Sequence, residues 1–203
     1  MTTLSRKERD RQLRRSDILT AAEHLFALKG YYKATIRDIA KEAQYATGTV
    51  YLHFKDKYAL YFALLEDKMK SLLSIVKDRI GQEPDAQKKL EIFVREGLGF
   101  FEKNQDFFRI FISERNELFS GRKILRSPIG LQLQEYTTSL IKEAQKEGVV
   151  SADFDPGQIS EVFISIIKTI LIKWLVDKEG KNENLVDLSD VVLKLFFYGV
   201  VRK

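Results

Sequence analysis

The stretch TIRDIAKEAQYATGTVYLHFKDK, residues 35–57, decides the fold of this chain. In its first half, apolar residues recur at three- and four-residue steps, as on the inner face of a short helix: Ile36, Ile39, Ala40 and Ala43. Thr35, followed three residues later by Asp38, resembles a capping box and predicts where this helix begins. After a short connection at 44–46, a second short helix is predicted over 47–54, with Val50 and Phe54 facing inward. Two short helices joined in this way form a helix-turn-helix motif.

Further helices are predicted on both sides of this motif. Before it, apolar residues at helical spacing begin near residue 14, and Gly30 suits the left-handed position that ends a helix. After it, Asp56 caps a helix of about 24 residues. Five more helices are predicted over 85–103, 106–119, 127–147, 156–178 and 184–200. Because no stretch alternates as a strand would, the predicted fold class is all-α with about nine helices.

The charge of the chain is concentrated in its first third. Of the 34 basic and 29 acidic residues, 12 and 7 lie in residues 1–60, which leaves 22 of each in the rest. The whole net charge of +5 therefore belongs to the part that holds the helix-turn-helix motif. Such a surplus indicates an anionic partner, with nucleic acid favoured over a basic surface that only improves solubility.

Composition excludes several kinds of site. The 203 residues include no cysteine and only two histidines, His24 and His53, so no metal and no cofactor is expected. No glycine-rich phosphate loop, HExxH pattern or serine-nucleophile motif is present, so an enzyme is not expected. The most apolar run, 159–176, contains three charges and is typical of a buried helix. With no signal peptide visible, we expect a cytoplasmic protein.

The motif region closely resembles the TetR family of bacterial transcriptional repressors. The resemblance covers about residues 14–62 and is carried by Ile18-Leu19, Ala21-Ala22, Leu25-Phe26, Gly30-Tyr31, Thr35-Ile36, Asp38-Ile39-Ala40, Ala43, Gly48-Thr49-Val50-Tyr51, His53-Phe54, Lys57 and Leu60. It implies a helix-turn-helix DNA-binding domain at 14–60 and a helical ligand-binding and dimerisation domain at 61–203. Residues 1–13 are predicted to form a basic N-terminal arm.

Nine residues are predicted to contact DNA. The start of a recognition helix must be small, polar and exposed to reach base edges, and Ala46, Thr47, Gly48 and Thr49 fit this requirement. The other five carry groups that can bind phosphates: Thr35, Tyr45, Tyr51, His53 and Lys57. The resemblance implies backbone contacts for Tyr51, His53 and Lys57.

Each assignment has a structural alternative. Tyr51 could pack its ring on the first helix, His53 could be a structural cap, and Thr35 is in any case a good helix cap. His24 is interpreted as structural. The basic residues at 6–15 either contribute to DNA affinity or are only solvated, and the same holds for Arg37 and Lys41.

Residues 85–150 have the composition of a sensor for an apolar ligand. Seven of the fourteen phenylalanines lie between residues 93 and 119. The predicted lining of a ligand pocket is Phe93, Phe100, Phe101, Phe107, Phe108 and Phe111, with Arg115 and Tyr136 as polar members. The alternative is that these aromatic residues form the ordinary core of a helical bundle. A fatty-acyl, an aromatic and a drug-like compound would each suit such a pocket.

The last two predicted helices are apolar around most of their circumference. The residues assigned to a dimer interface are Phe163, Ile166, Ile167, Ile170, Trp174, Val192, Leu195 and Phe196. A helix of this kind must be buried, either within its own subunit or against another chain. The resemblance implies that these two helices pair with their symmetry mates to form a homodimer.

The resulting prediction is a TetR-like regulator that binds a pseudo-palindromic double-stranded DNA operator as a homodimer. Repression is favoured over activation, with release by a largely apolar small molecule. The alternative is a helix-turn-helix protein that is controlled by a protein partner or that senses no ligand. Neither membrane binding nor the identity of the operator follows from the residues.

Overall fold

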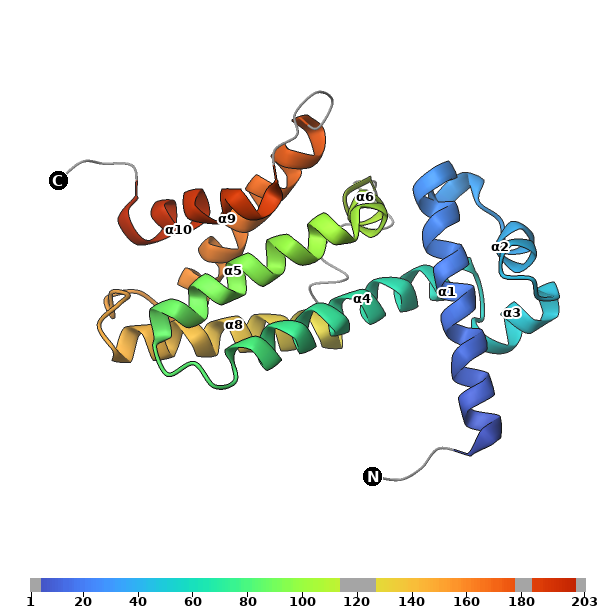
Figure 1. Cartoon of the computed structure of the whole chain (residues 1–203), viewed down its shortest axis with the longest axis horizontal. Helices are drawn as coiled ribbons and strands as arrows, with labels where there is room; N and C mark the ends of the chain where they lie inside the picture. The colour runs from blue at the N-terminus through green and yellow to red at the C-terminus, as the bar shows by residue number, and fades with distance from the viewer. Residues whose placement is uncertain (1–4, 114–126, 178–183, 200–203) are drawn as a thin grey trace. The chain divides into compact units, whose positions relative to one another are not determined.

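The structure is a computed structural model that describes residues 5–113, 127–177 and 184–199. Across these ranges it contains nine α-helices, one short 3-10 helix and no strand (Figure 1). The all-α prediction is confirmed. The chain divides into two compact units, Met1–Lys68 with Asp106–Ser120, and Met69–Gln105 with Gly121–Lys203.

The first unit holds the helix-turn-helix motif. It contains α1 (Arg6–Lys33), α2 (Ile36–Glu42), α3 (Thr47–His53), the first half of α4 (Lys57–Ile80) and most of α6 (Gln105–Ser113). Its core is built from fully buried apolar side chains, including Ile18, Ala22, Ile39, Val50 and Leu60. The hydroxyl of Tyr61 on α4 donates to the carbonyl oxygen of Ile110 on α6 at 3.5 Å. α6 therefore completes the same core as the motif.

The first helix begins earlier than the apolar stripe predicts. α1 starts at Arg6 and not near residue 14, so the predicted arm is helical from residue 6 onward. A capping box fixes this start: the Glu8 amide donates to Ser5 Oγ at 3.2 Å, and the Ser5 amide donates to the Glu8 carboxylate at 2.8 Å. At the other end, Gly30 has φ 76° and interrupts the helical conformation, as its left-handed prediction required.

The motif itself is held by local hydrogen bonds. Thr35 and Asp38 form the predicted capping box, with distances of 3.1 and 3.2 Å. In the turn between α2 and α3, Gln44 has φ 59°, a left-handed conformation that is uncommon outside glycine. The Tyr45 amide then donates to the Ala40 carbonyl at 2.9 Å, which closes the turn. α3 can therefore begin at Thr47 with its first residues exposed.

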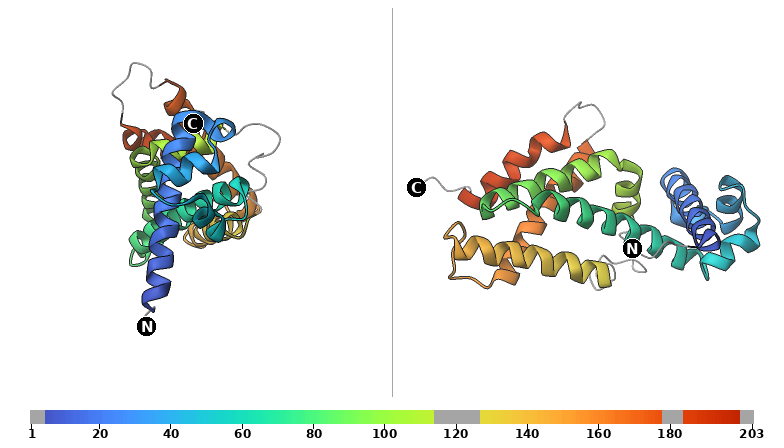
Figure 2. Two further views of the ribbon diagram at one scale, coloured as in Figure 1. Left: turned by 90° about the vertical axis from the view of Figure 1, so that its right-hand side faces the viewer. Right: turned by 60° about the horizontal axis from the view of Figure 1, so that its bottom comes forward.

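The second unit is a helical bundle. It contains the rest of α4, α5 (Ala86–Lys103), α8 (Pro128–Lys146), α9 (Pro156–Asp177), the 3-10 helix η1 (Leu185–Leu188) and α10 (Ser189–Tyr198). α5 packs against both α8 and α10, and α9 packs against α8 and α10 (Figure 2). Polar contacts join distant segments, such as Lys89 Nζ to Glu143 Oε2 at 2.6 Å and the Leu185 amide to Glu102 Oε1 at 2.7 Å.

The predicted helix limits in this half need two corrections. The helix predicted over 106–119 is described only to Ser113, and residues 114–126 lie outside the described ranges. The helix predicted over 184–200 begins with a 3-10 turn at Leu185–Leu188. No helix of the described residues is long and apolar enough to span a bilayer. The same residues contain no cluster of acidic and histidine side chains suited to a metal ion.

Candidate nucleic-acid interface

The start of α3 presents small side chains to the surface. Ala46 and Gly48 are exposed, and Thr47 and Thr49 are partly exposed. A Cβ atom added at Gly48 would have no other atom of the chain within 4 Å. A bulky partner can therefore approach the backbone closely at this point. This arrangement is what direct reading of base edges requires.

The end of α3 presents two larger polar side chains. Tyr51 has 54% of its surface exposed, so its ring is not buried against α1. His53 is half-buried. Burial lowers the pKa of His53 below its ordinary value, and the nearby charges of Arg11, Arg15 and Arg14 lower it further. The imidazole is therefore neutral at neutral pH and able to donate one hydrogen bond.

Tyr45 is tied to the first helix. Its hydroxyl donates to Asp17 Oδ2 at 2.8 Å, and this hydrogen bond, followed by burial, raises the pKa of Tyr45. On the other side of the motif, His24 Nδ1 lies 2.9 Å from Glu42 Oε1 and joins α1 to α2. Both contacts fix the position of α2 and the turn on α1.

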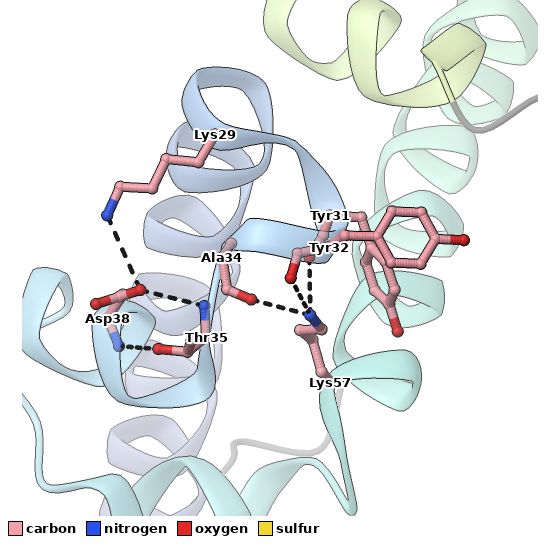
Figure 3. Close-up of polar contacts among 7 residues, drawn as sticks. All are labelled: Lys29, Tyr31, Tyr32, Ala34, Thr35, Asp38 and Lys57. Atoms are coloured by element: carbon pink, nitrogen blue, oxygen red, sulfur yellow. Dashed lines mark hydrogen bonds and ion pairs between the residues drawn. The ribbon is translucent and has the colours of Figure 1, made fainter.

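Thr35 and its neighbours form a polar cluster at the start of α2 (Figure 3). The Thr35 side chain is exposed, but its hydroxyl already accepts from the Asp38 amide. The hydrogen bonds from the side chain and amide of Thr35 lower the pKa of the Asp38 carboxyl group. Lys29 Nζ lies 3.9 Å from Asp38 Oδ2. The cap role of Thr35 is therefore established in this structure, and its DNA contact stays a prediction.

Lys57 lies where the sequence does not predict it. Its ammonium group donates to the carbonyl oxygens of Tyr31, Tyr32 and Ala34 at 2.8, 3.2 and 3.0 Å (Figure 3). It also lies 4.4 Å from the centre of the Tyr31 ring. Three donors meet three acceptors, so a phosphate contact would require at least one of these bonds to be given up. Lys57 clamps the segment between α1 and α2 to the start of α4.

Comparison with known proteins gives two matches to family models. One, described as bacterial regulatory proteins of the tetR family, matches residues 18–64, and one described as the C-terminal region of YsiA-like proteins matches residues 65–199. The chain belongs to the TetR family. It is accordingly a TetR-family transcriptional regulator, and the predicted resemblance is confirmed.

Three TetR-family relatives illustrate the match. The "Fatty acid metabolism regulator protein" of Bacillus subtilis is 25% identical over 189 residues, covering 92% of this chain and 95% of that protein. The "Probable acrEF/envCD operon repressor" of Escherichia coli is 24% identical over 191 residues, covering 90% and 86%. The crystal structure of the regulator FadR from Bacillus subtilis in complex with stearoyl-CoA has a TM-score of 0.84 at 22% identity, covering 92% of this chain and 99% of that chain.

The predicted ligand-lining residues fall into different units of this TetR-family chain. Phe93, Phe100 and Phe101 are buried in the second unit, where Phe93 lies 5.8 Å from the Phe163 ring. Tyr136 is half-buried in the same unit, with Lys77 Nζ 5.1 Å from its ring centre. Burial raises the pKa of the Tyr136 hydroxyl, and Glu143 adds to this. The remaining aromatic residues that the structure describes fully are Phe107 and Phe108, buried in the first unit. The Phe111 side chain and Arg115 lie outside the described residues.

The predicted dimer residues occupy two faces of α9 and α10. Four of them are buried inside the subunit and pack within its own core: Phe163, Ile167, Trp174 and Val192. The other four are only partly buried: Ile166, Ile170, Leu195 and Phe196. Ile166, Ile170 and Leu195 line a groove of about 550 Å³ on the second unit, together with Val162, which the prediction missed. Val162 has 58% of its surface exposed, so the unpaired apolar face is the one that contains it.

Replacing Lys57 with methionine separates its two possible roles. We expect K57M to lower the free energy of unfolding by about 2 kcal/mol, because charged hydrogen bonds to three carbonyls are lost. We also expect weaker DNA binding with an unchanged salt dependence, measured as the slope of log K against log salt. Loss of a phosphate contact would instead reduce that slope by about 0.9 for each site. The exposed neighbour Lys55, replaced in K55M, controls for the loss of charge and should leave stability unchanged.

Proposed function

We propose that this regulator represses transcription by binding a pseudo-palindromic operator as a homodimer and that a long-chain fatty-acyl compound releases it. The observation that carries the DNA-binding part is the start of α3, where Gly48 has open space around its Cα and is flanked by Thr47 and Thr49. A helix that packs on α2 from its buried side and exposes small polar residues at its start is suited to the major groove.

The homodimer is supported by the apolar groove on α9 and α10. Val162, Ile166 and Ile170 are spaced four residues apart along α9, so they form one stripe, and Leu195 of α10 lies beside it. A stripe of this kind left against water is unfavourable, and a second copy would bury it. A two-fold dimer would present two recognition helices to two half-sites.

The class of effector is supported by the sequence composition and by the relatives. A fatty-acyl chain needs an apolar cavity, and the residues predicted to line it are mostly phenylalanine. The relative named for fatty acid metabolism matches 92% of this chain, and the FadR structure of the same fold contains stearoyl-CoA. Release requires only that the effector bind the DNA-incompetent conformation more tightly than the competent one.

Selection from random duplex DNA tests the first part of this proposal. We expect the purified protein to enrich a pseudo-palindromic consensus. Weak binding that disappears at moderate salt, with no enriched motif, would contradict it, because phosphate attraction alone would account for that result.

Titration of the selected duplex with stearoyl-CoA tests the second part. We expect release of the duplex at stearoyl-CoA concentrations where CoA and butyryl-CoA, which carry the same head group, have no effect. Equal release by all three compounds would show that charge and not the acyl chain is recognised. Binding that none of them affects would favour control by a protein partner or the absence of ligand sensing.

A further inference from the structure

The first unit contains a second basic surface beside the recognition helix. An open groove of about 710 Å³ lies between the beginning of α1 and the end of α3. We call it the basic groove. Its α1 wall is formed by Arg6, Lys7, Asp10, Arg11 and Arg14, and its α3 wall by Leu52 and His53. The early start of α1 at Arg6 creates it, since an irregular arm would not hold these residues on one face.

The charge of the basic groove is unbalanced. Four cationic side chains face one carboxylate, that of Asp10. Within the described part of the chain, none of the four forms an ion pair, whereas the next arginine, Arg15, binds Asp67 at 2.6 Å. Like charges gathered in a concave surface repel one another, and the concavity strengthens the potential that an anion would meet. The groove is therefore suited to a polyanion.

The neighbourhood of His53 shows how close these charges lie to α3. Arg11 and Arg14 both lower the pKa of the His53 side chain, after the larger effect of burial. An anion in the basic groove would be attracted by these guanidinium groups and could accept a hydrogen bond from the neutral imidazole. Leu52, with 78% of its surface exposed, adds an apolar patch on the same wall.

We propose that the basic groove binds the sugar–phosphate backbone of DNA immediately outside the half-site read by α3. The proposal rests on the function proposed above. α3 has seven residues, which corresponds to a length of about 10 Å, so the groove at its end is continuous with the base-reading start of the same helix. Leu52 is placed to pack against deoxyribose while the cations bind phosphates. The groove adds affinity without sequence information, because phosphates are the same at every position.

A charge-matched pair of triple variants tests this inference in the full-length protein. The groove variant is R6Q/K7Q/R11Q, and the control is K88Q/K142Q/K146Q, which removes the same charge from exposed lysines of the second unit. Glutamine keeps helix propensity close to that of lysine and arginine. Thermal unfolding should be nearly the same for both variants and the wild type.

The measurement is affinity for the selected consensus on duplexes whose flanks are trimmed one base pair at a time. On long duplexes, we expect the groove variant to bind roughly 10-fold or more weakly than the control and to reduce the slope of log K against log salt by about 2 to 3 per protomer. Trimming should weaken the wild type and the control but not the groove variant. Both variants should select the same consensus as the wild type.

Two results overturn the proposal, and they are distinguishable. If the groove variant and the control lose affinity equally, or if trimming affects all three proteins alike, the groove binds no flanking DNA and the proposed function stands. If the wild type selects no consensus at all, the proposed function fails and the groove proposal fails with it.

Discussion

Replacement of Gly48 with leucine is expected to reduce operator affinity by about 100-fold or more while the protein becomes no less stable. Leucine is a good helix former, and the space around Gly48 within its own chain is empty. The side chain would instead occupy the volume that DNA must enter. Losing two contacts to base edges at about 1–2 kcal/mol each accounts for the size of the effect.

The alanine variant gives a sharper version of this test. In a helix, alanine is more favourable than glycine by about 0.5–1 kcal/mol, so G48A should raise the melting temperature while it weakens binding. Gly97 is the matched control, since it lies in α5 and an added Cβ would also meet nothing within 4 Å. G97A should raise stability similarly and leave operator affinity unchanged. Full operator affinity in G48L would refute a close approach of DNA to α3.

The second large effect is expected on the apolar stripe of α9. The double variant I166E/I170E places two carboxylates per subunit, and four per dimer, on the partly buried face of the proposed interface. An unpaired carboxylate buried at an interface costs several kcal/mol. We expect sedimentation to show a monomer and operator affinity to fall by roughly 100-fold or more, because the two half-sites are then bound independently.

The control for this variant is Ile75, which is 40% exposed on α4. I75E adds a carboxylate to an exposed apolar position outside the α9 stripe and should remain dimeric. Circular dichroism should be unchanged in both proteins, since Ile166 and Ile170 are only partly buried within the subunit. A dimer that persists in I166E/I170E would show that the subunits associate through a different surface.

The sequence predicted the helices well where an apolar stripe and a cap coincide. Thr35 and Asp38, and the restart of the chain at Asp56, are read from neighbouring residues alone, and their hydrogen bonds form as predicted. The start of α1 was missed because its first turns are exposed and have no stripe to detect. The signal available was Ser5 followed by Glu8, a capping box in a segment that otherwise reads as polar.

Side-chain roles were harder to predict because they depend on distant backbone. The Lys57 clamp needs three carbonyl oxygens to converge, and they do so only because Gly30 turns the chain at the end of α1. In α9, apolar residues around the whole helix predicted burial but not which partner each face meets. Phe163 faces the subunit core and Val162 faces outward, although they are adjacent in the sequence.

The hydrogen bond between Tyr61 and Ile110 has a consequence for exchange of parts between regulators. The first unit is discontinuous in the sequence: it needs residues from α6, which follow the whole of α5. A single recombination point after the helix-turn-helix motif would combine one protein's reading head with a foreign α6. A functional hybrid therefore requires two junctions, one within α4 and one between α5 and α6. The second junction must be followed by another that returns to the recipient after α6, so new DNA specificity is acquired more readily by point changes in α3 than by shuffling of gene segments.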